Sequence, residues 1–114
     1  MAEDLNLKEG EVYVGCYSIP AGNLIRVILL PGDADPARWH LQKAWAESLG
    51  GDLPNRIEQS MLFNLLRDQF KPAWYWSNEI DGSYAWYQFF GSGTQNSSLT
   101  HYELRARAVR REAI

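Results

Sequence analysis

Two short stretches near the start of the chain alternate apolar side chains with small or polar ones, as β-strands do. In residues 11–19 (EVYVGCYSI), Val12, Val14 and Cys16 lie on one side of the predicted strand. Residues 24–30 (LIRVILL) are rich in β-branched side chains and carry a single charge, which predicts a central strand. The intervening PAGN supplies turn residues, so we expect the two strands to pair as a hairpin.

The next segment changes to helical spacing. Asp35 followed by Pro36 predicts a helix start, because Asp caps the first turn and Pro lacks the N–H that would be unpaired there. Gly50-Gly51 predicts its end. The apolar stripe expected to face the core consists of Ala37, Leu41, Ala44, Trp45 and Leu49.

A second helix is predicted to start at Asn55. Glu58 stands three residues further on, the spacing of a capping box, and Lys71-Pro72 predicts the end of the helix. Its apolar stripe consists of Ile57, Met61, Leu62, Leu65, Leu66 and Phe70.

The last third of the chain has no helical stripe and predicts three strands with two connections. The strands are residues 74–79 (WYWSNE), 84–90 (YAWYQFF) and 103–111 (ELRARAVRR), with a loop at 91–101 (GSGTQNSSLTH). Strands at both ends and two helices between them predict an α+β fold. We expect one domain over residues 1–114, with residues 1–11 as a flexible leader.

Composition narrows the classes of function. The net charge of −3 argues against a general nucleic-acid binder, although arginines near the C-terminus leave a local anion site at Arg105 open. The longest apolar run is too short to cross a membrane, and the N-terminus lacks a signal-peptide pattern. We therefore expect a soluble cytoplasmic protein. Cys16, the single cysteine, is expected to be a buried thiol.

The sequence carries no recognisable catalytic or metal-binding motif. His40 and His101 are far apart and only one cysteine is present, which argues against zinc. Glu79 and Asp81, a candidate acid–base pair, are expected in a solvated turn, and Arg110-Arg111 is expected to be a solvated end. We therefore predict a protein that is not an enzyme and needs no metal or other cofactor.

The aromatic residues concentrate in the last third of the chain. Alternation along residues 84–90 places Tyr84, Trp86, Gln88 and Phe90 on one face, and Ala85, Tyr87 and Phe89 on the other. Trp74 or Trp76, together with Trp86, is expected to fill the core, whereas Tyr75, Tyr87 and Phe89 are expected to be exposed. Rigid amphipathic rings beside short polar side chains suit carbohydrate or protein recognition.

Four motifs occur in an order that resembles a known family. They are Leu53-Pro54-Asn55-Arg56, then Tyr75-Trp76-Ser77, then Ala85-Trp86 with Phe90 and Gly93, and finally Arg107-Ala108-Val109-Arg110. Over residues 36–111 the chain resembles the C-terminal domain family of Legionella collagen-like proteins, and most closely its short phage or prophage members.

This resemblance implies a C-type-lectin-like fold, with two helices packed on a mixed, mostly antiparallel sheet and a binding face on the C-terminal strands. It also implies framework roles for Trp76, Trp86, Phe90 and Arg107. The chain has neither a collagen-like segment nor the cysteines and calcium ligands of animal lectins. Trimer formation, sulfated-polysaccharide binding and calcium-dependent sugar binding are therefore not carried over.

The resulting hypothesis is a phage- or prophage-encoded, non-enzymatic binding module that recognises a host protein or a surface glycan. Two alternatives stay open: a structural accessory protein of the virion tail or baseplate, and a small intracellular inhibitor of a host enzyme or defence system. Homo-oligomer formation is also left open. The predicted contact residues are Tyr84, Tyr87, Phe89, Gln95, Asn96, Ser98, His101 and Arg105.

Overall fold

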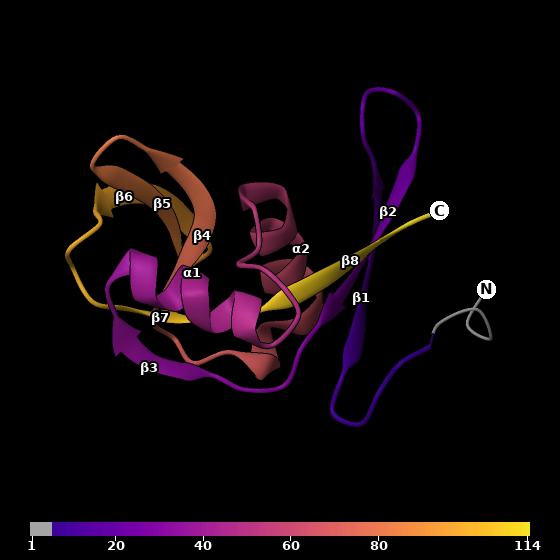
Figure 1. Cartoon of the computed structure of the whole chain (residues 1–114), viewed down its shortest axis with the longest axis horizontal. Helices are drawn as coiled ribbons and strands as arrows, with labels where there is room; N and C mark the ends of the chain where they lie inside the picture. Colours follow the sequence, from indigo (N-terminus) through magenta and orange to yellow (C-terminus); the bar gives the residue numbers. More distant parts are fainter. Residues whose placement is uncertain (1–5) are drawn as a thin grey trace.

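The computed structural model describes residues 6–114, which form two α-helices and eight strands in two sheets (Figure 1). The predicted N-terminal hairpin is confirmed: β1 (Val12–Ser18) pairs antiparallel with β2 (Leu24–Leu29). β8 (Val109–Ala113) pairs with the other side of β2, so β2 is the central strand of a three-stranded sheet. β1, from the start of the described chain, and β8, from its end, therefore lie in the same sheet.

The second sheet has five strands in the order β3-β7-β4-β5-β6. The pair β4–β7 is parallel and the other pairs are antiparallel. The predicted α+β class and the mixed, mostly antiparallel pairing are therefore confirmed, with two sheets in place of one. The five strands are β3 (Ala34–Ala37), β7 (Leu104–Ala106), β4 (Trp74–Asp81), β5 (Tyr84–Phe89) and β6 (Thr94–Leu99).

The predicted start of the first helix is wrong. α1 spans Trp39–Ser48, and Arg38 before it makes no side-chain cap. Asp35 and Pro36 belong instead to β3, which pairs with β7. β3 is an edge strand, and an edge strand tolerates a proline because one side of it needs no N–H.

The predicted stripe of α1 is correct at Trp45, which packs against the core, and wrong at Leu41, Ala44 and Leu49, which are exposed. The helix buries Trp39, Gln42 and Ala46, whereas Leu41 is 60% exposed. Gln42 takes an interior position because its amide donates to the carbonyl oxygens of Asp35 and Leu104, which satisfies the polar group. The predicted end of the helix is confirmed, since Gly50 has a φ of 82°.

The second helix begins where the sequence predicts. α2 spans Arg56–Leu66, and Asn55 and Glu58 form both hydrogen bonds of the capping box. The predicted stripe holds at Leu62, which is fully buried, but Ile57 and Leu65 face solvent. Glu58 and Gln59 are buried in their place. Within residues 6–114, no helix has the length and apolar character needed to cross a membrane.

The C-terminal third contains five strands where three were predicted. The predicted loop 91–101 contains β6, which is polar but pairs with β5 through six residue pairs. The predicted strand 103–111 is divided into β7 and β8, which belong to different sheets. The segment between them, Arg107 and Ala108, joins the two sheets, and the Ala108 carbonyl accepts from the Leu30 N–H.

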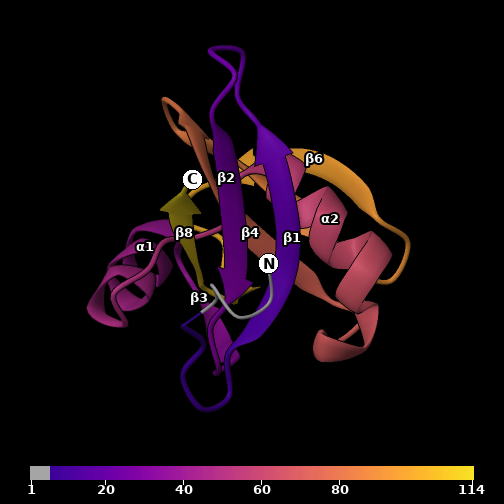
Figure 2. The ribbon, with the colours of Figure 1, turned by 90° about the vertical axis from the view of Figure 1, so that its right-hand side faces the viewer.

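Two hydrophobic clusters fill the interior. One lies between α1 and the five-stranded sheet, around Trp39, Trp76 and Ala106. The other lies between α2 and the three-stranded sheet, around Leu62, Val27 and Phe90. Figure 2 shows the three-stranded sheet with α2 beyond β1 and α1 beyond β8.

The structure bears on two predictions for the N-terminal region, the burial of Cys16 and the flexible leader 1–11. Cys16 is exposed rather than buried, because a bulge between Tyr13 and Gly15 shifts the register of β1. Part of the predicted flexible leader 1–11 lies outside the described residues. In the remainder, Glu11 is half-buried and is paired with Arg110, with a nitrogen–oxygen distance of 2.9 Å.

Candidate ligand-binding face

One face of the five-stranded sheet carries large aromatic rings. In the β4–β5 register, Trp74 lies opposite Phe89 and Trp76 lies opposite Tyr87. Alternation of side chains therefore places all four rings on the same face. The opposite face of β4 carries Tyr75, which is buried against Phe90.

The α1 side covers only part of this face. The indole of Trp39 donates to the Ser77 carbonyl at 2.7 Å, and the indole of Trp76 donates to the Ala37 carbonyl at 3.0 Å. Trp76 is fully buried there, whereas Trp74 at the start of β4 is 47% exposed. The part of this face that α1 covers therefore includes Trp76 but not Trp74.

Trp74 is held by stacking. Its ring and that of Phe89 lie 4.7 Å apart between centroids at an angle of 25°. The Phe89 ring passes so close to Gly91 that a Cβ there would lie 2.4 Å from Phe89 Cζ. A side chain at position 91 would clash with the Phe89 ring, so glycine is needed there for the ring to take this position.

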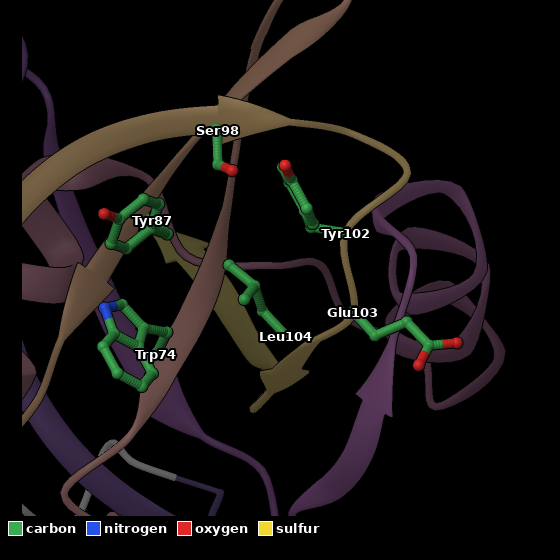
Figure 3. Close-up of a pocket in the computed structure, with 6 residues that line it drawn as sticks. All are labelled: Trp74, Tyr87, Ser98, Tyr102, Glu103 and Leu104. Carbon is green, nitrogen blue, oxygen red and sulfur yellow. The ribbon is translucent and has the colours of Figure 1, made fainter.

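Beside this stack the surface forms a hollow of about 380 Å³ (Figure 3). In Figure 3, Trp74 and Tyr87 form one side, while Tyr102 and Glu103 come from the segment that connects β6 and β7. We call this site the aromatic hollow. Its lining residues are Trp74, Tyr87, Ser98, Tyr102, Glu103 and Leu104.

The base of the aromatic hollow is fixed to the core. The Leu104 carbonyl accepts from the Gln42 amide at 2.9 Å, which ties β7 to α1 beneath the site. Tyr102 is 52% exposed, and its ring lies 4.7 Å from that of His101. Glu103 is the one charged residue among those that line the hollow. Figure 3 shows the Glu103 carboxylate pointing away from the other lining side chains. The rings and hydroxyls that remain suit reversible binding of a polar, uncharged molecule with an apolar surface.

Only some of the predicted contact residues meet here. Tyr87 and Ser98 line the hollow, Phe89 supports Trp74, and Asn96 is exposed on β6 opposite Tyr87. His101 lies beside Tyr102, as described above. Sequence reasoning did not place Trp74 at the site, because it left open whether Trp74 or Trp76 fills the core. It also missed Tyr102, Glu103 and Leu104, because the hollow forms only when the segment after β6 folds back.

Three predicted contact residues are placed elsewhere. Tyr84 lies on the opposite face, in a separate hollow with Trp86 and Ser97. The Gln95 amide points inward and donates to the Arg56 carbonyl at 2.7 Å and to Gln88 Oε1 at 3.0 Å. It therefore holds β6 to α2 and does not reach the aromatic hollow.

Arg105, the third of these residues, is committed to an internal ion pair. Its Nε donates to Asp33 at 2.9 Å, and the same carboxylate accepts from the Tyr75 hydroxyl. The predicted anion site at Arg105 is thus already filled by a carboxylate of the chain. The expectation that Tyr75 is exposed is wrong for the same reason, since its ring reaches through the core to Asp33.

Titration of Tyr75 is expected to weaken the fold at high pH. Burial, together with the bond donated to Asp33, raises the pKa of Tyr75 to about 12. A raised pKa means that the folded protein favours the neutral phenol, so this stabilisation is present below pH 10 and is lost between pH 10 and 12. We expect roughly 2 kcal/mol of unfolding free energy to disappear over this range.

Urea unfolding followed at several pH values measures this loss. Tyr75→Phe serves as the control, because it retains the ring and has no proton to lose. An equally steep loss in Tyr75→Phe would assign the effect to other groups.

The four predicted framework residues contact other parts of the core in different ways. Phe90 is buried and stacks on Phe70 with centroids 4.0 Å apart. The expectation that Trp86 fills the core is wrong: it is half-buried and belongs to neither hydrophobic cluster, and the Arg56 guanidinium lies 4.0 Å from the centroid of its ring. Arg107 donates to the carbonyl oxygens of Gln69 and Leu30, and burial lowers the pKa of its guanidinium. Trp76 is the fourth and is fully buried.

Arg111 is not the solvated end that was predicted. It donates to both carboxylate oxygens of Glu58, at 2.6 and 2.7 Å, and to Asp52 at 3.0 Å. Burial disfavours the charge of Arg111, but the bonds to Glu58 outweigh it and raise the pKa of Arg111. Asp52 also accepts from Lys43, and Glu58 accepts from the Tyr17 hydroxyl. This network ties β8 to α2 and lies away from the aromatic hollow.

The expectation that Glu79 and Asp81 lie in a solvated turn is wrong. They lie at the end of β4, and Glu79 accepts from the Arg56 side chain at 3.0 Å and from its N–H at 2.8 Å. In residues 6–114, no cluster of three or more His, Cys, Asp or Glu side chains is arranged to hold a metal ion. Comparison with protein-family models and with curated proteins finds no match for this sequence.

Proposed function

We propose that this protein is a non-enzymatic binding module that recognises a neutral glycan through the aromatic hollow. The observation that carries the proposal is the exposed Trp74 ring, held by Phe89 and facing Tyr102 across a hollow of about 380 Å³. The apolar C–H face of a sugar ring packs against aromatic rings of this kind. Its hydroxyls would hydrogen-bond to the Ser98 hydroxyl at the hollow.

The charges around the site favour an uncharged glycan over a sulfated one. Glu103 would repel an anionic sugar, and Arg105 is paired with Asp33. A surface glycan of a bacterial host fits both this chemistry and the phage-type, C-type-lectin-like module that the family resemblance implies. As part of the same proposal, the protein would act in the cytoplasm of such a host or as part of a virion.

A host protein is the second candidate ligand. Trp and Tyr are the side chains most enriched among residues that dominate binding energy at protein interfaces, and Trp74 and Tyr102 are each about half exposed. In that case the same residues bind a protein loop. The experiment below separates the two ligand classes because it begins with purified glycans.

Two matched tyrosine variants test the site. An array of neutral and sulfated bacterial glycans is expected to show binding to neutral members, with affinities then measured by calorimetry. Tyr102→Ala is expected to lose about 10-fold in affinity, and Trp74→Ala at least that much, because each removes a ring from the hollow. Tyr84→Ala is the control, since Tyr84 is 50% exposed but lies on the opposite face.

Equal losses in Tyr102→Ala and Tyr84→Ala would contradict the site. Binding only to sulfated glycans, with a steep dependence on salt, would contradict the neutral ligand. If the array shows no binding and a host protein is captured in a Trp74-dependent manner, the second candidate is correct.

A further inference from the structure

The outer edge of β1 is open. Within residues 6–114, β2 is the one strand that pairs with β1, so the backbone groups on its other side have no partner strand. Open edges are usually protected by charged side chains, proline, a bulge or a covering element, and β1 (VYVGCYS) has a bulge but no charge and no proline. Its bulge lies between Tyr13 and Gly15, and residues 15–18 keep a regular register with β2. This stretch can receive another strand.

An exposed apolar stripe lies beside this edge. Ile57, Met61 and Leu65 are spaced four residues apart on α2. Ile57 and Leu65 are 59% and 61% exposed, whereas Met61 between them is half-buried and packs on the hydrophobic cluster under the sheet. Figure 2 shows α2 next to β1 on the side away from β2. The neighbouring exposed residues Ser60 and Asn64 are uncharged. Edge and stripe together form a surface without charge on a chain whose net charge is −3.

Along the direction of β1, the middle of the strand and the middle of the α2 stripe lie side by side. Tyr17 bonds Glu58 near the start of α2, whereas Met61 Cε lies 3.2 Å from the position of a Cβ on Gly15. α2 therefore runs opposite to β1, and Met61, the middle of the stripe, lies against the middle of the strand. A single two-fold axis between Cys16 and Tyr17 would pair the regular stretch 15–18 with its copy and bring α2 beside a second α2.

We propose that this surface binds a second copy of the chain, forming a two-fold symmetric dimer with a continuous six-stranded sheet. A symmetric interface brings each patch against itself, so an uncharged, self-complementary patch lets two chains of equal charge associate without repulsion. The dimer joins β1 to its copy in antiparallel orientation and covers both apolar stripes. The aromatic hollow is on the other sheet, so the dimer presents two hollows, whatever their ligand.

Sedimentation velocity on the full-length chain tests the dimer with two matched leucine variants. Wild-type protein is expected to sediment as a dimer over a broad micromolar range. Leu65→Lys is expected to weaken the dimer more than 10-fold, because it buries a charge in the interface. Leu41→Lys is the control, since Leu41 on α1 is 60% exposed and outside the interface. Circular dichroism spectra establish that each variant is folded.

The single thiol provides a second measurement. Cys16 is exposed and lies near the proposed axis, so a short bis-maleimide should link two wild-type chains and should link Leu65→Lys poorly. A wild-type monomer throughout would overturn the proposal. So would a dimer that dissociates equally in both leucine variants, or one whose thiols do not react together.

Discussion

Replacing Arg111 by methionine is expected to destabilise the protein by about 3–5 kcal/mol. Glu58 is fully buried, and both of its carboxylate oxygens accept from Arg111. Methionine retains much of the length of the side chain but removes the charge, which leaves the Glu58 carboxylate in the interior without its cation. Urea unfolding of the two proteins at neutral pH measures the difference.

The double variant Glu58→Gln with Arg111→Met isolates the charge. It removes both charges while an amide oxygen stays available to the capping box at Asn55. We expect it to recover a large part of the lost stability, because no unpaired ion remains in the interior. A loss below about 1 kcal/mol in Arg111→Met would mean that solvent replaces the guanidinium, as it does at exposed ion pairs.

Removal of the Trp76 ring is expected to cost a similar amount, about 3–5 kcal/mol for Trp76→Ala. The ring is fully buried between α1 and the five-stranded sheet, and its indole donates to the Ala37 carbonyl. The substitution creates a cavity and leaves that carbonyl without its partner. The midpoint of chemical unfolding, followed by far-ultraviolet circular dichroism, is the measurement.

Trp74→Ala is the matched control for stability. It removes the same side chain from the same face of the same strand, but Trp74 is 47% exposed and is stacked on Phe89 alone among the aromatic rings described. We expect a much smaller loss of stability and, by the proposal above, a loss of ligand affinity. Similar destabilisation by both substitutions would show that Trp74 belongs to the core and would weaken its assignment to the binding site.

Local signals in the sequence were sufficient for several elements. The capping box at Asn55 and Glu58 determined the start of α2, because both of its bonds lie within one helical turn. Alternation and the PAGN turn determined the β1–β2 hairpin, and Gly50 determined the end of α1. Each of these elements depends on residues that are close in the chain.

Long-range contacts decided where the sequence was misleading. Asp35 and Pro36 have the pattern of a helix start but form β3, because β7 supplies a partner strand. Polar residues 94–99 look like a loop but form β6, because backbone pairing with β5 requires no apolar side chains. On α1, Gln42 faces the core and Leu41 faces solvent, because the Gln42 amide donates to two carbonyl oxygens there.

The candidate site divides in the same way. The sequence by itself determined that the last third is an aromatic strand region, and that Tyr87 and Phe89 share a face, because side chains alternate along any strand. Only the tertiary structure decided that Trp74 is exposed while Trp76 is buried, since α1 covers one of two neighbouring positions on that face. It also decided that Tyr102 and Glu103 complete the hollow and that Arg105 is already paired, because these relations join residues distant in the chain.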